Sequence, residues 1–175
     1  MTDLSEPHRR YAAAVLFAMD KHRIQTRRDC TPYIALPIRV AQSLRTIGGI
    51  SDEDVVIAGL LHDLIEDTEC DYDAIESRSG ARVAGLVAEM TADMRLPKPE
   101  RRRQQVAHIQ TASREAKSIK LADRYDNLTE MYGFSEKRRV EYIESSRAVL
   151  EACSGANPAL EAALKGVIRR LERAG

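Results

Sequence analysis

The sequence lacks a net charge and a long apolar stretch. Its 27 Lys and Arg residues are balanced by 27 Asp and Glu residues. Because duplex nucleic acid and anionic membranes favour strongly basic surfaces, this balance argues against a nucleic acid polymer or a membrane as the main partner. No stretch approaches about 18 uninterrupted apolar residues, so we expect no membrane-spanning helix.

Cysteine is scarce and odd in number. Cys30, Cys70 and Cys153 are widely spaced, which suits neither a disulfide framework nor a zinc motif built from close cysteine pairs. We expect them to be reduced thiols. The N-terminus carries acidic residues and lacks the apolar core of a signal peptide. Together these features predict a cytoplasmic protein.

What the chain does contain is a helical pattern. Long segments rich in Ala, Leu, Arg and Glu are separated by short breaks of Pro, Gly, Ser and Asp, and no alternating run of strand length is present. We predict an all-α fold, a helical bundle of about eight to ten helices, in a single domain over residues 1–175. The helices are expected at about 8–26, 37–47, 52–67, 71–78, 80–93, 99–108, 113–131, 135–153 and 157–173.

The segment from His62 to Thr68 carries the strongest chemical signal. On one continuous helix, opened by a capping box at residues 51–54, a step of about 100° per residue brings four polar side chains to one face. They are His62, Asp63, Glu66 and Asp67. An imidazole beside carboxylates can bind a divalent cation, and further carboxylates can orient or deprotonate a water. A solvated acidic face with one incidental histidine is the alternative, with about equal weight.

Asp123 is a second candidate ligand. It shares one helical face with Lys120, Arg124 and Asn127. Its carboxylate can reach into a cleft, or it can be an ordinary surface group paired with a basic neighbour on its own helix. Spacing alone favours the surface interpretation.

Taken together, these motifs resemble a known family. His62–Thr68 is similar to the HD-x-x-EDT motif of the RelA/SpoT hydrolase domain, and Lys120–Arg124 resembles its KLADR segment. The agreement extends to Thr31–Ile34, Leu96–Arg101 and the Glu141-Tyr142 helix, so that it covers nearly the whole chain. The arrangement is most similar to the small single-domain metazoan SpoT homologues and their bacterial relatives. The resemblance implies the HD phosphohydrolase fold.

The resemblance also implies a reaction, the metal-dependent removal of the 3′-pyrophosphate from the alarmones ppGpp and pppGpp. The implied cofactor is Mn²⁺, with another divalent cation as the alternative, and the family holds it with two histidines and two aspartates. His62, Asp63 and Asp123 match three of these ligands. The remaining family histidine directly precedes a proline, and here that position is Leu36, which has no donor atom.

Further site residues follow from the same resemblance. Glu66 and Asp67 are implied to position and activate the attacking water. The implied substrate-binding residues are Arg27, Arg28, Lys98, Arg101, Asn127 and Tyr142. Guanidinium groups can hold phosphate or stack on a base, while an amide and a phenol can contact the nucleoside. From spacing alone, the basic residues fit a solvated surface equally well, and Tyr142 fits a core aromatic.

Leu36 leaves three hypotheses open. The chain can be an active hydrolase of alarmones, or of another nucleotide such as NADPH, with three protein ligands for the metal. It can be a catalytically impaired protein that binds nucleotide as a sensor. Leu36 can also be an introduced change. The sequence indicates no oligomeric state.

Overall fold

The computed structural model describes residues 5–131 and 134–173. These residues form ten α-helices and one isolated bridge between Thr26 and Pro32, with no β-strand among them, which confirms the all-α prediction. The helices are α1 Glu6–Lys21, α2 Ala35–Thr46, α3 Glu53–Leu61, α4 Leu64–Asp67, α5 Tyr72–Ser79, α6 Ala81–Ala88, α7 Lys98–Thr111, α8 Arg114–Thr129, α9 Glu136–Ala152 and α10 Pro158–Arg173. Within this part of the chain, no helix has the length and apolar character needed to cross a bilayer.

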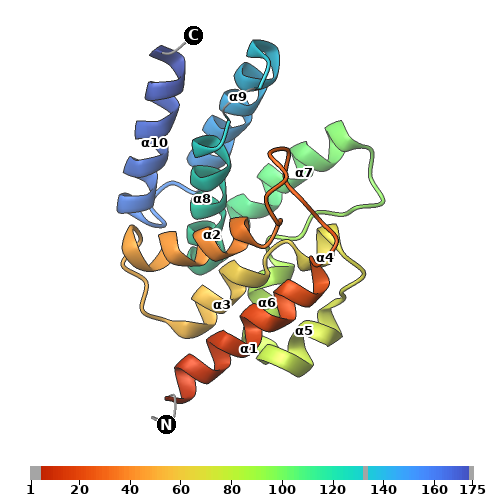
Figure 1. Cartoon of the computed structure of the whole chain (residues 1–175). Helices are drawn as coiled ribbons and strands as arrows, with labels where there is room; N and C mark the ends of the chain where they lie inside the picture. Colours follow the sequence, from red (N-terminus) through yellow and green to blue (C-terminus); the bar gives the residue numbers. More distant parts are fainter. Residues whose placement is uncertain (1–4, 132–133, 174–175) are drawn as a thin grey trace.

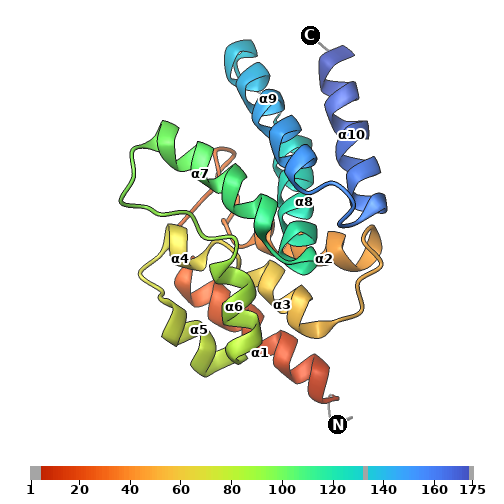
Figure 2. The same cartoon turned by 180° about the vertical axis from the view of Figure 1, so that it is seen from behind.

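The helices form two groups that meet at α2, α3 and α8. Helix α2 packs against both α3 and α8. On one side α1 and α6 pack on α3, and on the other α9 and α10 pack on α8. Figure 1 shows α8, α9 and α10 upright at one end of the molecule, with α1, α5 and α6 at the other. From behind, α7 runs beside α9, and the two ends of the chain lie far apart (Figure 2).

Helix α3 is the centre of the core because it is apolar on every side. All seven of its residues from Val55 to Leu61 are buried, as expected for a helix with no polar face. Its N-cap is Asp52, whose carboxylate accepts the Asp54 N–H at 3.0 Å. The predicted capping box begins at Ser51, so its cap is wrong by one residue. Arg82 also pairs with the Asp52 carboxylate, at 2.7 Å.

Two predicted helices end well before their expected last residue, and a third is interrupted. The first stops at Lys21, where His22 caps it, and residues 22–34 form a loop. The predicted helix 80–93 stops at Ala88, and the Glu89 carboxylate accepts the Ser113 N–H at 2.5 Å instead. The predicted helix 52–67 breaks between α3 and α4, at His62 and Asp63. At Glu89 and at His62, contacts with α8 or its N-cap accompany the end of the helical segment and oppose local helix propensity.

Candidate active site at the break between α3 and α4

The break between α3 and α4 places His62 and Asp63 opposite Asp123 of α8. His62 Nε2 lies 3.1 Å from Asp63 Oδ1 and 3.6 Å from Asp123 Oδ1. Only 3% of His62 and 6% of Asp123 are exposed. We call these three side chains the His–Asp cluster. The surface interpretation of Asp123 is wrong, since its carboxylate is buried against an imidazole from another element.

One ring nitrogen of His62 is fixed, while the other faces the carboxylates. Nδ1 lies 2.8 Å from the Gly59 carbonyl oxygen and donates to it. Nε2 is buried and has no hydrogen-bond partner among the described residues. Burial opposes protonation of the ring, but Asp63 and Asp123 outweigh it and raise the pKa of His62 well above its usual value. The cluster therefore attracts a cation to Nε2.

The donors of the His–Asp cluster suit a divalent cation. A metal-ligating histidine commonly donates its other ring N–H to a carbonyl or carboxylate, as His62 does. Two ligand atoms at about 2.1 Å from one ion lie about 3 Å apart, close to the separations found here. Within residues 5–131 and 134–173, however, no group of three or more His, Cys, Asp or Glu side chains is already arranged around a common point. A bound cation thus requires a carboxylate to turn.

Leu36 occupies the position where the resemblance implies a further ligand. It lies in the first turn of α2, the helix that packs on both α3 and α8, and is 2% exposed. Leu36 belongs to the hydrophobic core. The cluster therefore has at most three protein ligands of the implied set.

Lys120 and Asn127 hold the carboxylate of Asp123. Lys120 Nζ lies 3.3 Å from Asp123 Oδ2, and Asn127 Nδ2 donates to Asp123 Oδ1 at 2.5 Å. Burial raises the pKa of Asp123, but Lys120, His62 and Arg124 together outweigh burial, so that the net pKa is lowered. Asp123 is therefore ionised. Asn127, expected to contact nucleoside, here orients the cluster.

Glu66 and Asp67 border the cluster on α4. Glu66 Oε1 accepts the Ala92 N–H at 2.6 Å, and burial raises its pKa although Lys120 opposes the shift. Asp67 Oδ2 accepts from the Tyr33 hydroxyl at 2.8 Å, and burial together with the Asp63 charge raises its pKa. Asp67 is thus a stronger base than an ordinary aspartate, and it is partly open to solvent.

A pocket of about 700 Å³ adjoins the cluster at Tyr33. Arg27 and Arg28 line it, as expected of substrate-binding residues, together with Glu130 and Phe134. Arg27 is paired with Glu130 at 2.8 Å, and the Arg28 guanidinium lies 4.6 Å from the centre of the Phe134 ring. We call this the neutral pocket, because its arginines are balanced by acids and it offers an aromatic face.

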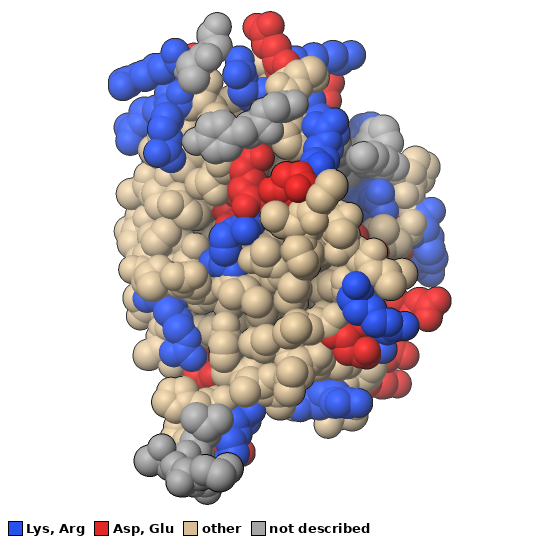
Figure 3. Space-filling model, viewed as in Figure 1, with Lys and Arg blue, Asp and Glu red and all other residues tan. Residues whose placement is uncertain are grey.

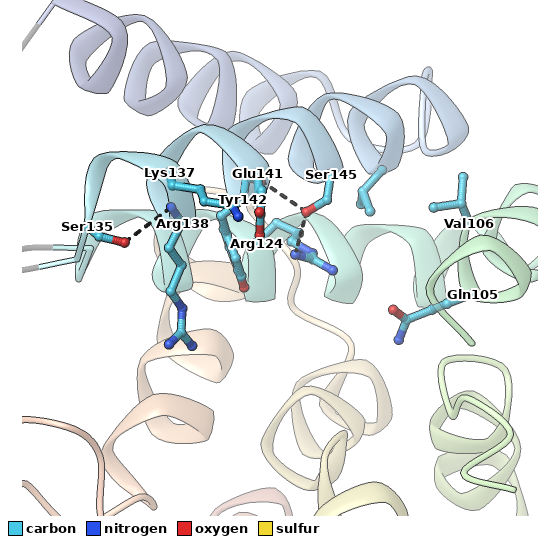
Figure 4. A pocket seen from close by; sticks show the side chains of 10 residues that line it. Gln105, Val106, Arg124, Ser135, Lys137, Arg138, Glu141, Tyr142 and Ser145 are labelled. Atoms are coloured by element: carbon cyan, nitrogen blue, oxygen red, sulfur yellow. Dashed lines mark hydrogen bonds between the residues drawn. The ribbon is translucent and has the colours of Figure 1, made fainter. Parts of the chain in front are cut away.

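A second pocket, of about 550 Å³, is lined by residues of α7, α8 and α9 (Figure 4). Tyr142 lines it and also packs against the hydrophobic core, so that the binding and the core interpretations both remain open. Arg124, Lys137 and Arg138 face the same space with a single acid, Glu141. Arg124 lies next to Asp123 in the chain, with its guanidinium 5.0 Å from the centre of the Tyr142 ring. We call this the cationic pocket.

Arg101, another predicted binding residue, contacts Met94: its Nη1 lies 2.8 Å from the Met94 sulfur. The side chain of Lys98 lies outside the described residues. Sequence reasoning gave no role to Tyr33, Arg138 or Phe134, because only the folded chain brings the 22–34 loop beside α8 and α9. Figure 3, which has the same view as Figure 1, shows acidic and basic groups side by side near the centre of the molecule.

Comparisons with known proteins show which proteins this chain resembles. A family model described as HD domain matches residues 14–151. The guanosine-3′,5′-bis(diphosphate) 3′-pyrophosphohydrolase MESH1 of Danio rerio is 44% identical over 158 residues, covering 86% of this chain and 88% of that protein. Its Homo sapiens counterpart is 44% identical over 161 residues, covering 88% and 90%. The solved structure of a metazoan ortholog of SpoT that hydrolyses ppGpp matches with a TM-score of 0.88 and 36% identity, over 97% of this chain and 98% of that one.

Proposed function

The chain belongs to the HD domain family, and from this premise we propose that it is a metal-dependent 3′-pyrophosphohydrolase of ppGpp and pppGpp. The oxygen of water bonds to the phosphorus that is attached to the ribose 3′ oxygen. The bond between that phosphorus and the ribose 3′ oxygen breaks. The ribose oxygen leaves with a proton. The products are pyrophosphate and GDP from ppGpp, or pyrophosphate and GTP from pppGpp.

The observation that carries this proposal is the buried His–Asp cluster between two different pockets. Tyr33 links the cluster to the neutral pocket, and Arg124 links Asp123 to the cationic pocket. An alarmone is equally asymmetric, with a base at one end and dense phosphate charge at the other. We assign the base to the neutral pocket, where Arg28 and Phe134 offer flat faces, and the pyrophosphate to the cationic pocket.

Hydrolases of this family are metal-dependent. His62, Asp63 and Asp123 would hold the ion, and we propose Mn²⁺ because one imidazole nitrogen with carboxylate oxygens suits it. When bound, such an ion lowers the pKa of a water and polarises a phosphoryl oxygen. Lys120 keeps Asp123 ionised, and the Gly59 carbonyl keeps His62 Nε2 free of a proton when the ring is neutral.

Asp67 is the group that we assign to take the proton from the attacking water. Its carboxylate borders the cluster and reaches solvent, and its raised pKa brings it closer to the neutral range in which a general base works well. Glu66 is anchored to the Ala92 N–H and faces Lys120. It is suited to orient the water rather than to move.

The test is to incubate the purified protein with ppGpp and Mn²⁺ and to measure pyrophosphate and GDP, with Asp63→Ala alongside. Release by the unaltered protein, abolished in Asp63→Ala, supports the proposed reaction with three protein ligands. Leu36 favours the alternative of a nucleotide-binding sensor. This alternative predicts that the unaltered protein binds ppGpp without releasing pyrophosphate, and that Leu36→His releases it. Parallel incubations with NADPH distinguish the remaining substrate alternative.

We further place the protein in the cytoplasm. Support comes from the three cysteines, each free in the structure. Two of them, Cys70 and Cys153, are buried, which raises the pKa of both thiols and makes them poorly reactive.

A further inference from the structure

Tyr33 is held rigidly in the loop between α1 and α2. The bridge between Thr26 and Pro32 closes this loop, and the Tyr33 N–H donates to the Gln25 carbonyl at 3.0 Å. The phenol ring contacts His22, with the ring centres 4.7 Å apart. Backbone and ring therefore fix the direction of the side chain.

The Tyr33 hydroxyl lies between two carboxylates of the candidate site. It is 2.7 Å from Asp63 Oδ2 and 2.8 Å from Asp67 Oδ2. Asp63 belongs to the His–Asp cluster, whereas Asp67 is the proposed base. Two carboxylates so close repel each other. Among the described side chains, the Tyr33 hydroxyl lies within hydrogen-bond distance of both oxygens and donates its one proton to either of them.

Gln25 attaches the same loop to the end of α4. Its Nε2 donates to the Asp67 carbonyl at 2.5 Å, and its Oε1 lies 2.7 Å from His22 Nδ1. Because the amide donates through nitrogen, its oxygen accepts from the His22 ring. The backbone of Asp67 is thus fixed by Gln25 and its carboxylate by Tyr33.

We propose that Tyr33 is a positioning residue, which holds the Asp67 carboxylate beside Asp63 for the attack of water. This inference rests on the proposed function. Asp67 reaches solvent, so without the hydroxyl its side chain can rotate outward, away from Asp63. Tyr33 also lines the neutral pocket, but Tyr33→Phe keeps the ring and removes only the hydroxyl, which contacts the two carboxylates. Tyr33→Phe should therefore lower kcat and leave KM for ppGpp nearly unchanged.

The first experiment compares Tyr33→Phe with the unaltered protein in the ppGpp assay. We expect kcat to fall about 10–100-fold, the usual effect of removing a group that orients a metal site, with KM changed less than about twofold. Tyr11→Phe is the matched control, because it removes a hydroxyl from a half-buried tyrosine on α1, away from the cluster. Thermal unfolding of both variants shows whether the fold is kept. Unchanged kcat in a folded Tyr33→Phe protein overturns the proposal.

A double mutant separates positioning from general damage. If Tyr33 acts through Asp67, then Tyr33→Phe lowers kcat much less in an Asp67→Asn background than in the unaltered protein. Equal reductions in both backgrounds overturn the proposal. If the unaltered protein releases no pyrophosphate, the proposed function fails. Calorimetric titration with Mn²⁺ alone then tests the positioning role of Tyr33. Tyr33→Phe should then bind Mn²⁺ about tenfold more weakly, and equal affinity, or no binding by either protein, rules the positioning role out.

Discussion

Replacing Leu36 with histidine should exchange stability for metal affinity. Leu36 is 2% exposed in the core, so its loss removes about 1.5–3 kcal/mol of hydrophobic stabilisation. A buried imidazole without a partner costs about 1–3 kcal/mol more. We therefore expect metal-free Leu36→His to be less stable by about 2.5–6 kcal/mol. For a domain of this size that corresponds to a fall in Tm of roughly 5–24 °C.

Mn²⁺ should reverse much of this loss. A cation at a hundred times its Kd stabilises the folded state by about 2.7 kcal/mol. An added imidazole ligand should strengthen binding by tenfold or more, since even changes around the ligands alter affinity about 10–100-fold. At a fixed Mn²⁺ concentration, the rise in Tm should therefore be larger for Leu36→His than for the unaltered protein.

The assay is thermal unfolding with EDTA and with Mn²⁺, together with calorimetric titration of the ion. Leu44→His is the control, because Leu44 is fully buried on the same helix, about 12 Å further along it. It should lose similar stability and gain nothing from Mn²⁺. If Mn²⁺ shifts all three proteins equally, Leu36 does not face the cation site and the reasoning is refuted.

Four further results are expected. Gly59→Ala should lower the free energy of unfolding, measured by urea denaturation, by about 1–3 kcal/mol, because a Cβ there would lie 2.4 Å from Leu44 Cδ1. A Cβ at Gly85 would meet nothing within 4 Å, so Gly85→Ala should not lower it. Arg82→Gln should lower the free energy of unfolding by up to about 1 kcal/mol at pH 7. Since the Arg82 hydrogen bond lowers the pKa of Asp52 from its usual 3.8, the stability difference between the two proteins should vanish as the pH falls below that value. A difference that persists at pH 2 would contradict this. Because the pKa of Asp67 is raised by burial and by Asp63, kcat/KM should rise with pH through a value above the usual aspartate range, and Asp67→Asn should abolish that step. Arg138→Ala should raise KM for ppGpp about tenfold, while Arg169→Ala on the exposed face of α10 should leave it unchanged.

Helix content and most helix positions could be predicted because they depend on local pattern. Helix α10, for example, runs over 158–173 against an expected 157–173, since its ends follow from nearby Pro and Gly residues. The break at His62 could not be predicted. Local propensity favours one continuous helix there, whereas contacts from distant parts of the chain, among them Tyr33 from a loop about 30 residues away and Asp123 from α8, stabilise the broken form. Long-range contacts of this kind leave no periodic trace in a sequence.

The site was predictable to the extent that the motifs contain it. His62, Asp63 and Asp123 do lie together, although spacing alone favoured a surface position for Asp123. Burial of Lys120 beside it could not be foreseen, because a lysine among charged neighbours usually remains in water. The roles of all these residues stay predictions, as does the single domain over residues 1–175.

The bond from His62 Nδ1 to the Gly59 carbonyl joins the end of a helix to the centre of the site. A helix leaves its last carbonyls without donors from its own backbone, and here the imidazole supplies one of them. Any replacement of His62 therefore removes a hydrogen bond from the last turn of α3 as well as the imidazole from the His–Asp cluster. Loss of activity in such a variant is ambiguous evidence about chemistry. In the lineage of this chain, the same bond gives His62 a reason to persist under selection for folding alone, even if turnover were lost.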